Sequence, residues 1–222
     1  MAAQRPTVEY FFSFVSLWSY IGSHVFQTLV NRNNTPVEFK PIDLMATFEA
    51  GGSKKVRERP IPRQAYRLVE MKRWRDRYNI PLVLWPKFYP VDPSLGHRML
   101  LAAIREGSDV TAFAHAGLRA VWADELNVAD PQTLVRVANA NGLNGARLLA
   151  QEADPAIKAR EAALTQEAID RQLFGAPFYF YRDEPFWGQD RLDMLEQAIK
   201  SGRPPIPWPQ PEELDPATAR RK

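Results

Sequence analysis

The stretch TVEYFFSFVSLWSYIGSHVFQTLV, residues 7–30, decides the fold. Its first eight residues are rich in aromatic and β-branched side chains, which is typical of a strand buried on both faces. From residue 20 onward the apolar residues recur at helical spacing. Ser16 lies between the two patterns, at the place expected for a helix N-cap. The order predicts a strand, a turn and a helix whose N-terminus favours an anion beside Ser16.

The segments that follow predict a second strand and then a mostly helical block. A short strand is expected over 37–43, and residues 45–65 are expected to be irregular and basic. A helix over 63–78 would turn an apolar and aromatic face inward, formed by Tyr66, Met71, Trp74 and Tyr78. Residues 80–93 carry four prolines among aromatic residues, which predicts a loop, and the alanine- and leucine-rich stretch 95–172 predicts several helices.

Strand character returns near the C-terminal end of the chain. Residues 176–188 predict a strand, a turn and a short second strand, and residues 189–200 predict a helix. The two β-rich ends must fold together, which gives an α/β domain (β-α-β … β-β-α) built from 7–44 and 173–201. An all-helical insertion, residues 45–172, interrupts this domain. Six prolines mark residues 202–222 as an extended or disordered tail.

Two short motifs refine this α/β prediction. Ser16 and Ser19 have the spacing at which redox members of the thioredoxin-like fold carry C-x-x-C. Residues 175–178, GAPF, open the later strand, and a cis bond before Pro177 would turn the polar groups of Ala176 outward. Together the motifs outline a thioredoxin-like fold. Two serines form no disulfide, so the site does not perform thiol–disulfide exchange with its own side chains.

Composition excludes several classes of site. The chain of 222 residues has no cysteine, which excludes disulfides, zinc–thiolate and iron–sulfur centres and a cysteine nucleophile. Its three histidines, His24, His97 and His115, have no partner at metal-ligand spacing, so no metal site is expected. No secretory signal and no apolar run of membrane-spanning length is present, so a cytoplasmic protein without membrane association is expected.

The charge of the chain is unevenly distributed. Residues 54–77 contain ten Lys or Arg residues and three acidic residues, a local charge of +7, so the rest carries −4 of the total of +3. For most of these cations a solvated helix face is the simpler interpretation. No zinc finger, RRM or helix-turn-helix signature accompanies them, so nucleic acid is not expected as a partner. We therefore expect some of these cations to form one surface that faces a small anion.

The chain resembles a known family, the 2-hydroxychromene-2-carboxylate isomerases. These are related to kappa-class glutathione transferases and DsbA-like oxidoreductases. Four segments carry the resemblance: EYFFSFVSLWSY (9–20), RQAYRLVEMKRW (63–74), FGAP (174–177) and FWGQDRL (186–192). The last is the most specific, and the order and separation of all four make the combination strong.

The resemblance implies a glutathione site. Ser16 matches the serine whose hydroxyl contacts the sulfur of glutathione, and Ala176 the residue before the cis-proline, Pro177, whose backbone pairs with the cysteinyl part. Gln189 and Asp190 fall where the γ-glutamyl end is held, and Arg63 stands where the family usually has a lysine for a carboxylate. The chain also departs from the family at Leu17, in place of a proline, and at Gln189, in place of a smaller residue.

The family uses a glutathione thiolate that adds reversibly to a conjugated, ring-opened pyruvate system, so that the former double bond rotates. The substrate, a small aromatic carboxylate, needs a cation and an apolar wall. Candidates for the carboxylate are the basic residues between 54 and 63, among them Lys54. Candidates for the ring are Trp18, Trp85 and Phe88, although an aromatic loop is more often packing.

Two other functions remain open on sequence alone. A kappa-like glutathione transferase or peroxidase would share the thiol site, and a non-redox DsbA-like binding protein would keep the fold without chemistry. An enzyme needs a closed pocket with a cation, whereas a peptide-binding protein needs an open apolar groove. A homodimer is implied by the family resemblance only.

Overall fold

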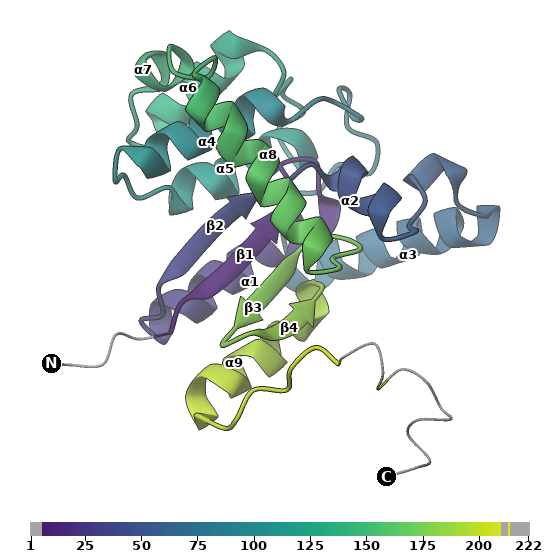
Figure 1. Cartoon of the computed structure of the whole chain (residues 1–222). Helices are drawn as coiled ribbons and strands as arrows, with labels where there is room; N and C mark the ends of the chain where they lie inside the picture. The colour runs from purple at the N-terminus through teal and green to yellow at the C-terminus, as the bar shows by residue number, and fades with distance from the viewer. Residues whose placement is uncertain (1–5, 210–212, 214–222) are drawn as a thin grey trace, which may run out of the picture.

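The computed structural model describes residues 6–209 and residue 213, and all statements below concern these residues. Four strands form one mixed sheet in the order β2-β1-β3-β4 (Figure 1). Their bounds are Val8–Phe12 for β1, Val37–Pro41 for β2, Phe178–Tyr181 for β3 and Glu184–Trp187 for β4. β1 pairs in parallel with β2 and antiparallel with β3. Strands from both ends of the chain therefore share one sheet, which confirms the predicted thioredoxin-like α/β fold.

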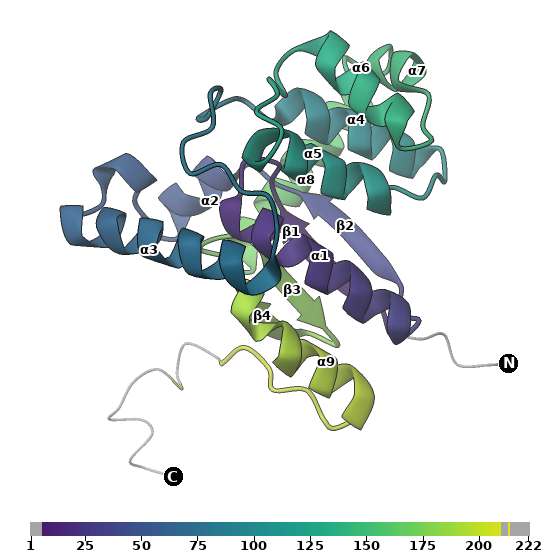
Figure 2. The same ribbon diagram turned by 180° about the vertical axis from the view of Figure 1, so that it is seen from behind.

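Helices cover both faces of this sheet. Helix α1 (Leu17–Arg32) and helix α9 (Leu192–Ser201) lie together on one face, as Figure 2 shows. Helix α8 (Pro155–Asp170) crosses the opposite face beside the short helix α2 (Leu44–Ala50) (Figure 1). Tyr10 and Phe12 of β1 fill the space beneath α1, where the rings of Tyr10 and Tyr179 stack with centroids 5.0 Å apart. The first stretch of sequence thus forms a strand buried on both faces, as predicted.

The long block between β2 and β3 is helical apart from its connections. It contains η1 (Val56–Glu58), α3 (Ile61–Tyr78), α4 (Ser94–Arg105), α5 (Thr111–Trp122), α6 (Pro131–Ala140) and α7 (Gly145–Leu149). Helices α4 to α7 gather above one end of the sheet and α3 extends to the side (Figure 1). One continuous apolar core joins this block to the sheet, because Phe14, Phe113 and Trp122 belong to the same buried cluster. The domain boundaries at 44/45 and 172/173 stay a prediction.

An ion-pair network fixes α8 to the sheet. The Lys40 Nζ on β2 lies 2.5 Å from Glu9 Oε1 and 2.6 Å from Glu167 Oε1 of α8. Burial disfavours the charged form of Lys40, but the hydrogen bonds to Glu167 and Glu9 outweigh it and raise the pKa of Lys40. Arg171 adds a second cation, with Nη1 2.7 Å from Glu9 Oε2. The buried lysine is therefore neutralised by the helix that covers it.

Two local predictions on α2 and α3 were wrong. The segment 45–65 is not irregular throughout, because α2 continues to Ala50 with Asp43 as its N-cap, accepting from the Met45 N–H at 2.8 Å. Tyr66 does not face inward. It is 58% exposed, and the Arg73 guanidinium lies 5.9 Å from its ring centroid. Both predictions relied on residue type. The first overlooked a helix in the basic segment, and the second placed Tyr66 on the wrong face of α3.

The first part of the predicted tail is held against the fold. Residues 202–209 contain no helix or strand, in line with the expected extended chain. Arg203 nevertheless pairs with the buried carboxylate of Glu184 at 2.6 Å, and Trp208 packs 6.0 Å from the ring of Phe178. The remaining tail residues, apart from residue 213, lie outside the described residues.

The described residues contain neither a membrane-spanning helix nor a metal-binding cluster. No helix among them has the length and apolar character needed to cross a bilayer. Within residues 6–209 there is also no group of three or more His, Cys, Asp or Glu side chains arranged to hold a metal ion.

Candidate functional site

Ser16 lies at the point where β1 turns into α1. Its hydroxyl oxygen accepts a hydrogen bond from the Ser19 N–H at 3.2 Å and so caps the helix. The same hydroxyl donates to the carbonyl oxygen of Ala176 at 3.0 Å. The side chain is buried, with 3% of its surface exposed. Ser16 therefore connects the first turn of α1 to the segment that opens β3.

A histidine of the insertion holds the other side of this turn. The N–H of Phe14 donates to Nε2 of His97 at 3.2 Å, so this nitrogen carries no proton and the ring N–H lies on Nδ1. Nδ1 lies 3.7 Å from Oε1 of Glu161 on α8. His97 is 1% exposed. Helices α4 and α8 thus set the position of the backbone that leads into Ser16.

The proline motif lies directly opposite the serine turn. The Ala176–Pro177 peptide bond is cis, and the Pro177 carbonyl accepts from the Gly188 N–H at 3.0 Å. Gly188 has a φ of +100°, a left-handed conformation that favours glycine. This hydrogen bond places the first turn of the 3-10 helix η2 (Gln189–Arg191) beside the proline motif. Two motifs from the C-terminal part of the sequence therefore meet at one edge of the site.

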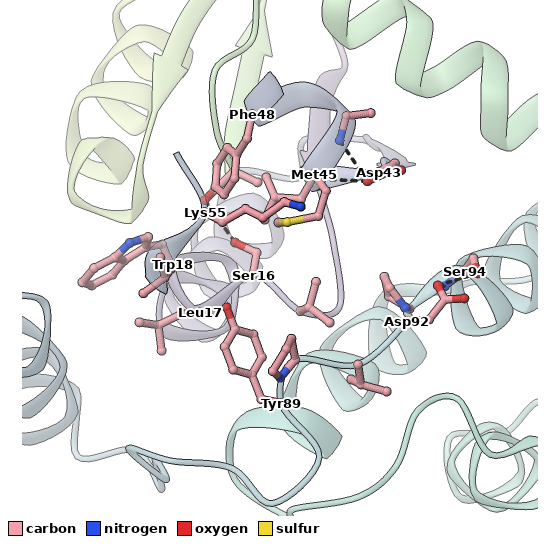
Figure 3. Close-up of a pocket in the computed structure, with 18 of the residues that line it drawn as sticks. Ser16, Leu17, Trp18, Asp43, Met45, Phe48, Lys55, Tyr89, Asp92 and Ser94 are labelled. Atoms are coloured by element: carbon pink, nitrogen blue, oxygen red, sulfur yellow. Dashed lines mark hydrogen bonds between the residues drawn. The ribbon is translucent and has the colours of Figure 1, made fainter. Parts of the chain in front are cut away.

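A large cavity opens above Ser16. Its volume is about 1160 Å³, and its wall combines aromatic side chains with cations from the insertion. Figure 3 shows Ser16 between Trp18 and Tyr89, with the Lys55 side chain reaching in from the opposite wall. The lining also includes Trp85, Trp122, Arg57, Arg59, Arg67, His97, Lys158, Glu161 and Ala176. The cavity has both an apolar wall and positive charge, which suits an aromatic anion.

A second, smaller cavity of about 310 Å³ lies beside the first and shares Arg59 with it. It is lined by Gly52, Ser53, Lys54, Arg59, Pro60 and Arg63. The Ser53 hydroxyl donates to the carbonyl of Phe174 at 3.0 Å, which fixes this basic segment to the chain just before Ala176. Three cations in a small polar cavity suit a carboxylate.

The candidate site residues fall into three groups. Ser16, Trp18, Trp85 and Ala176 line the large cavity. Lys54 and Arg63 line the small one. The others line neither of these two cavities and are Phe88, Pro177, Gln189 and Asp190.

Gln189 and Asp190 lie very differently. Gln189 is buried against α1, where a Cβ on Gly22 would lie 2.6 Å from its own Cβ. Asp190 is exposed, with Oδ2 2.8 Å from Arg191 Nη1. Of the two, only Asp190 presents its side chain to a ligand from solvent.

Among the residues of the large cavity that the sequence did not single out are Arg67, Tyr89 and His97. A signal existed for Arg67, because it precedes Met71 by four positions and so shares the buried face of α3. No local signal marks His97, whose contact with Phe14 spans 83 residues.

Comparisons with known proteins agree with this geometry. Residues 7–200 match the family described as DSBA-like thioredoxin domain. The 2-hydroxychromene-2-carboxylate isomerase of Sphingobium xenophagum is 28% identical over 195 residues, covering 87% of this chain and 97% of that protein. A solved structure of HCCA isomerase has a TM-score of 0.75 at 27% identity, covering 88% of this chain and 95% of that one. These findings confirm the resemblance to this group of isomerases.

A more distant relative represents the kappa class. Glutathione S-transferase kappa 1 of Caenorhabditis elegans is 22% identical over 212 residues, covering 90% of this chain and 93% of that protein. This chain is thus similar to members of both groups.

Proposed function

Because the chain belongs to the DSBA-like thioredoxin domain family, we propose that it is a glutathione-dependent isomerase of 2-hydroxychromene-2-carboxylate or a related aromatic carboxylate. One observation carries the proposal. A buried serine hydroxyl, Ser16, lies at a helix N-terminus opposite the cis-proline motif and at the wall of a cavity that combines aromatic side chains with cations. This arrangement supports thiol chemistry in a protein without cysteine.

The residues present fit glutathione. The Ala176 N–H has no hydrogen-bond partner among residues 6–209, so it remains free to pair with the backbone of a bound peptide. Lys54 and Arg63 in the small cavity are placed to receive a carboxylate of the tripeptide, and Asp190 to receive its amino group. When bound, glutathione would supply the thiolate that adds reversibly to the conjugated double bond of the substrate.

The residues around the sulfur position can favour a thiolate at neutral pH. A free thiol with a pKa of about 8.5 becomes mostly thiolate if its pKa falls by about two units, which requires about 2.7 kcal/mol. A hydrogen bond from the Ser16 hydroxyl to a charged acceptor contributes about 1.5–3 kcal/mol. The N-terminus of α1 contributes about 0.3–1 kcal/mol more. The single proton of Ser16 must leave the Ala176 carbonyl to reach a thiolate, which costs about 1 kcal/mol, so Ser16 and the helix together reach the required free energy at the upper end of these ranges.

The positive charge of the cavity wall argues against the binding-protein alternative. Its wall carries Lys55, Arg57, Arg59 and Arg67, whereas a groove for an apolar peptide would lack such cations. A kappa-like transferase or peroxidase would use the same thiol site and stays the second candidate, supported by the kappa relative. Action in the cytoplasm and assembly as a homodimer are proposed with the family and stay predictions.

The first test is a thermal melt with and without reduced glutathione. Glutathione at about 100 times its dissociation constant stabilises a binding protein by about 2.7 kcal/mol, or roughly 5–10 °C for a chain of this length. We expect D190A and R63M to lose most of this shift. The matched control D193A alters another acidic residue two positions into α9 and should keep it.

The outcomes separate the candidates. Absence of a shift in the unaltered protein at millimolar glutathione would refute glutathione dependence and favour the binding protein. With a shift established, isomerisation of the cis aromatic carboxylate is followed by absorbance with and without glutathione. Conjugation of glutathione to an electrophile without isomerisation would favour the transferase instead.

A further inference from the structure

Three arginines in the wall of the large cavity, Arg57, Arg59 and Arg67, have no carboxylate partner among residues 6–209, and of these Arg59 and Arg67 are partly buried. Arg59 donates from Nε to the carbonyl of Lys54 at 2.9 Å, and its guanidinium lies 5.5 Å from the ring centroid of Phe48. Arg67 donates from Nη1 to Met71 Sδ at 3.2 Å and lies 5.7 Å from the Trp122 ring. These contacts hold each guanidinium in place but leave most of its donors unused.

The pKa values of both guanidinium groups are lowered in this arrangement. Burial lowers the pKa of Arg67, and the nearby charge of Arg59 lowers it further. Burial also lowers the pKa of Arg59, with a further contribution from Arg63. Neighbouring cations without an anion are unfavourable, so a bound anion would relieve both burial and repulsion.

Two other arginines of α3 form ion pairs with acidic residues of the same helix. Arg73 lies 2.7 Å from Glu70 and Arg75 lies 3.0 Å from Asp76, both on the outer surface. Arg67, on the inner face, has no such partner in the described chain. Arg63 and Arg77 of α3 also form no ion pair in the described chain, but both are exposed to solvent, so Arg67 differs from them in being unpaired while partly buried at the cavity wall.

The acidic residues of the cavity wall are already engaged elsewhere. Asp43 caps α2, and Asp92 accepts from the Ser94 N–H at 2.9 Å. Glu161 lies 3.4 Å from Arg98 and faces His97. None of these carboxylates is therefore paired with the two guanidinium groups, which can receive an anion from outside the protein.

Tyr89 adds a neutral donor to the wall that holds these two arginines and Ser16. Its ring packs 4.7 Å from that of Trp122, and its N–H donates to the Pro86 carbonyl at 3.1 Å. The side chain points toward Ser16 with its hydroxyl leading (Figure 3). This hydroxyl has no hydrogen-bond partner among the described residues, and it lies close enough to Arg59 and Arg67 to influence both.

We propose that Arg67 and Arg59 bind the carboxylate of the substrate and that Tyr89 donates to its neighbouring 2-oxo oxygen. The ligand class is a conjugated aryl 2-oxo acid, whose unsaturated chain would extend through the cavity toward Ser16. A fork of guanidinium donors matches a carboxylate, and a phenol hydroxyl matches a carbonyl oxygen. The inference rests on the proposed isomerase function for the identity of the substrate, but it predicts binding without glutathione.

The first experiment uses the unaltered protein and benzylidenepyruvate as the probe, without glutathione. Trp18, Trp85 and Trp122 line the cavity, so quenching of tryptophan fluorescence reports binding. We expect the methyl ester of the probe to bind about tenfold or more weakly than the acid, because charge-assisted hydrogen bonds are lost. Equal affinity for acid and ester would overturn the proposal, whatever the glutathione melt shows.

Variants then assign the roles. R67M should raise the Kd of the acid about tenfold or more and change that of the ester less than about threefold. R75M, on the outer face of α3, is the matched control and should leave both unchanged. Y89F should weaken benzylidenepyruvate about three- to tenfold but not cinnamate, which lacks the 2-oxo group. Equal weakening of acid and ester in R67M, or no effect of Y89F, would refute the assigned contacts.

Discussion

Ser16→Ala tests whether the Ser16 hydroxyl both stabilises the fold and donates a hydrogen bond to a bound thiolate. The substitution removes two hydrogen bonds, the helix cap to Ser19 at 3.2 Å and the bond to the Ala176 carbonyl at 3.0 Å. Loss of a serine N-cap costs about 1 kcal/mol, and loss of one neutral hydrogen bond to a buried carbonyl about 1 kcal/mol. We therefore expect a loss of about 2 kcal/mol, or about 4–8 °C in Tm for a chain of this size.

Ser16→Gly separates the two roles of Ser16. Glycine is nearly as good an N-cap as serine, so S16G keeps most of the cap energy and loses about half as much stability as S16A. Neither variant can donate to a thiolate. That hydrogen bond is worth about 0.5–2 kcal/mol after the bond to the Ala176 carbonyl is given up, so its loss should raise the pKa of bound glutathione by about half a unit to one and a half units in both.

Two measurements check this prediction. Urea unfolding gives the order of stability, which should be unaltered protein, then S16G, then S16A. Ultraviolet thiolate absorbance of bound glutathione against pH gives the thiol pKa in each protein. If the two variants share the pKa of the unaltered protein, Ser16 is a cap and no more. If S16A unfolds like the unaltered protein, the two hydrogen bonds carry no net stability and the reasoning fails.

Two further predictions concern the core and the surface. G117A should lower the free energy of unfolding by about 1–3 kcal/mol, because the added Cβ would lie 2.4 Å from the buried ring of Phe14; an unchanged urea midpoint would contradict this. Hydrogen bonds, first of all from Arg32, lower the pKa of Glu196 to about 2, so its contribution to stability is present above its ordinary pKa near 4.5 and is lost as the pH falls toward 2. E196Q should therefore be less stable than the unaltered protein at pH 7, by about 1 kcal/mol or less since the pair meets solvent, and the difference should shrink toward pH 2 in urea titrations.

Much of the fold was predictable because its signals are local. The aromatic strand, the serine at the helix start and the Gly-Ala-Pro motif each lie within a few residues, and β1, α1 and β3 form where these patterns occur. The pairing of strands from the two ends of the chain followed from their β-rich sequences, whereas the order β2-β1-β3-β4 is known from the structure. Ser16 and Ala176 were both identified, and their hydrogen bond places them together.

The wall of the large cavity was not predictable in the same way. Composition marks residues 54–77 as basic, but it does not say which cation faces inward. Lys54 lines the small cavity and Phe88 lines neither, whereas Arg67 and Tyr89 line the large one. The direction of each side chain depends on how α3 packs against α1 and α5, and that packing joins segments that are far apart in sequence.

The turn before Ser16 shows why two distant segments are needed for one site. His97 of the insertion accepts the N–H of Phe14, and Ala176 near β3 accepts the hydroxyl of Ser16, so one short turn is held from both sides. Contacts that span 83 and 160 residues form only when the insertion and the sheet are packed together. The large cavity and the turn that carries Ser16 are therefore parts of one cooperative unit, joined through the shared apolar core.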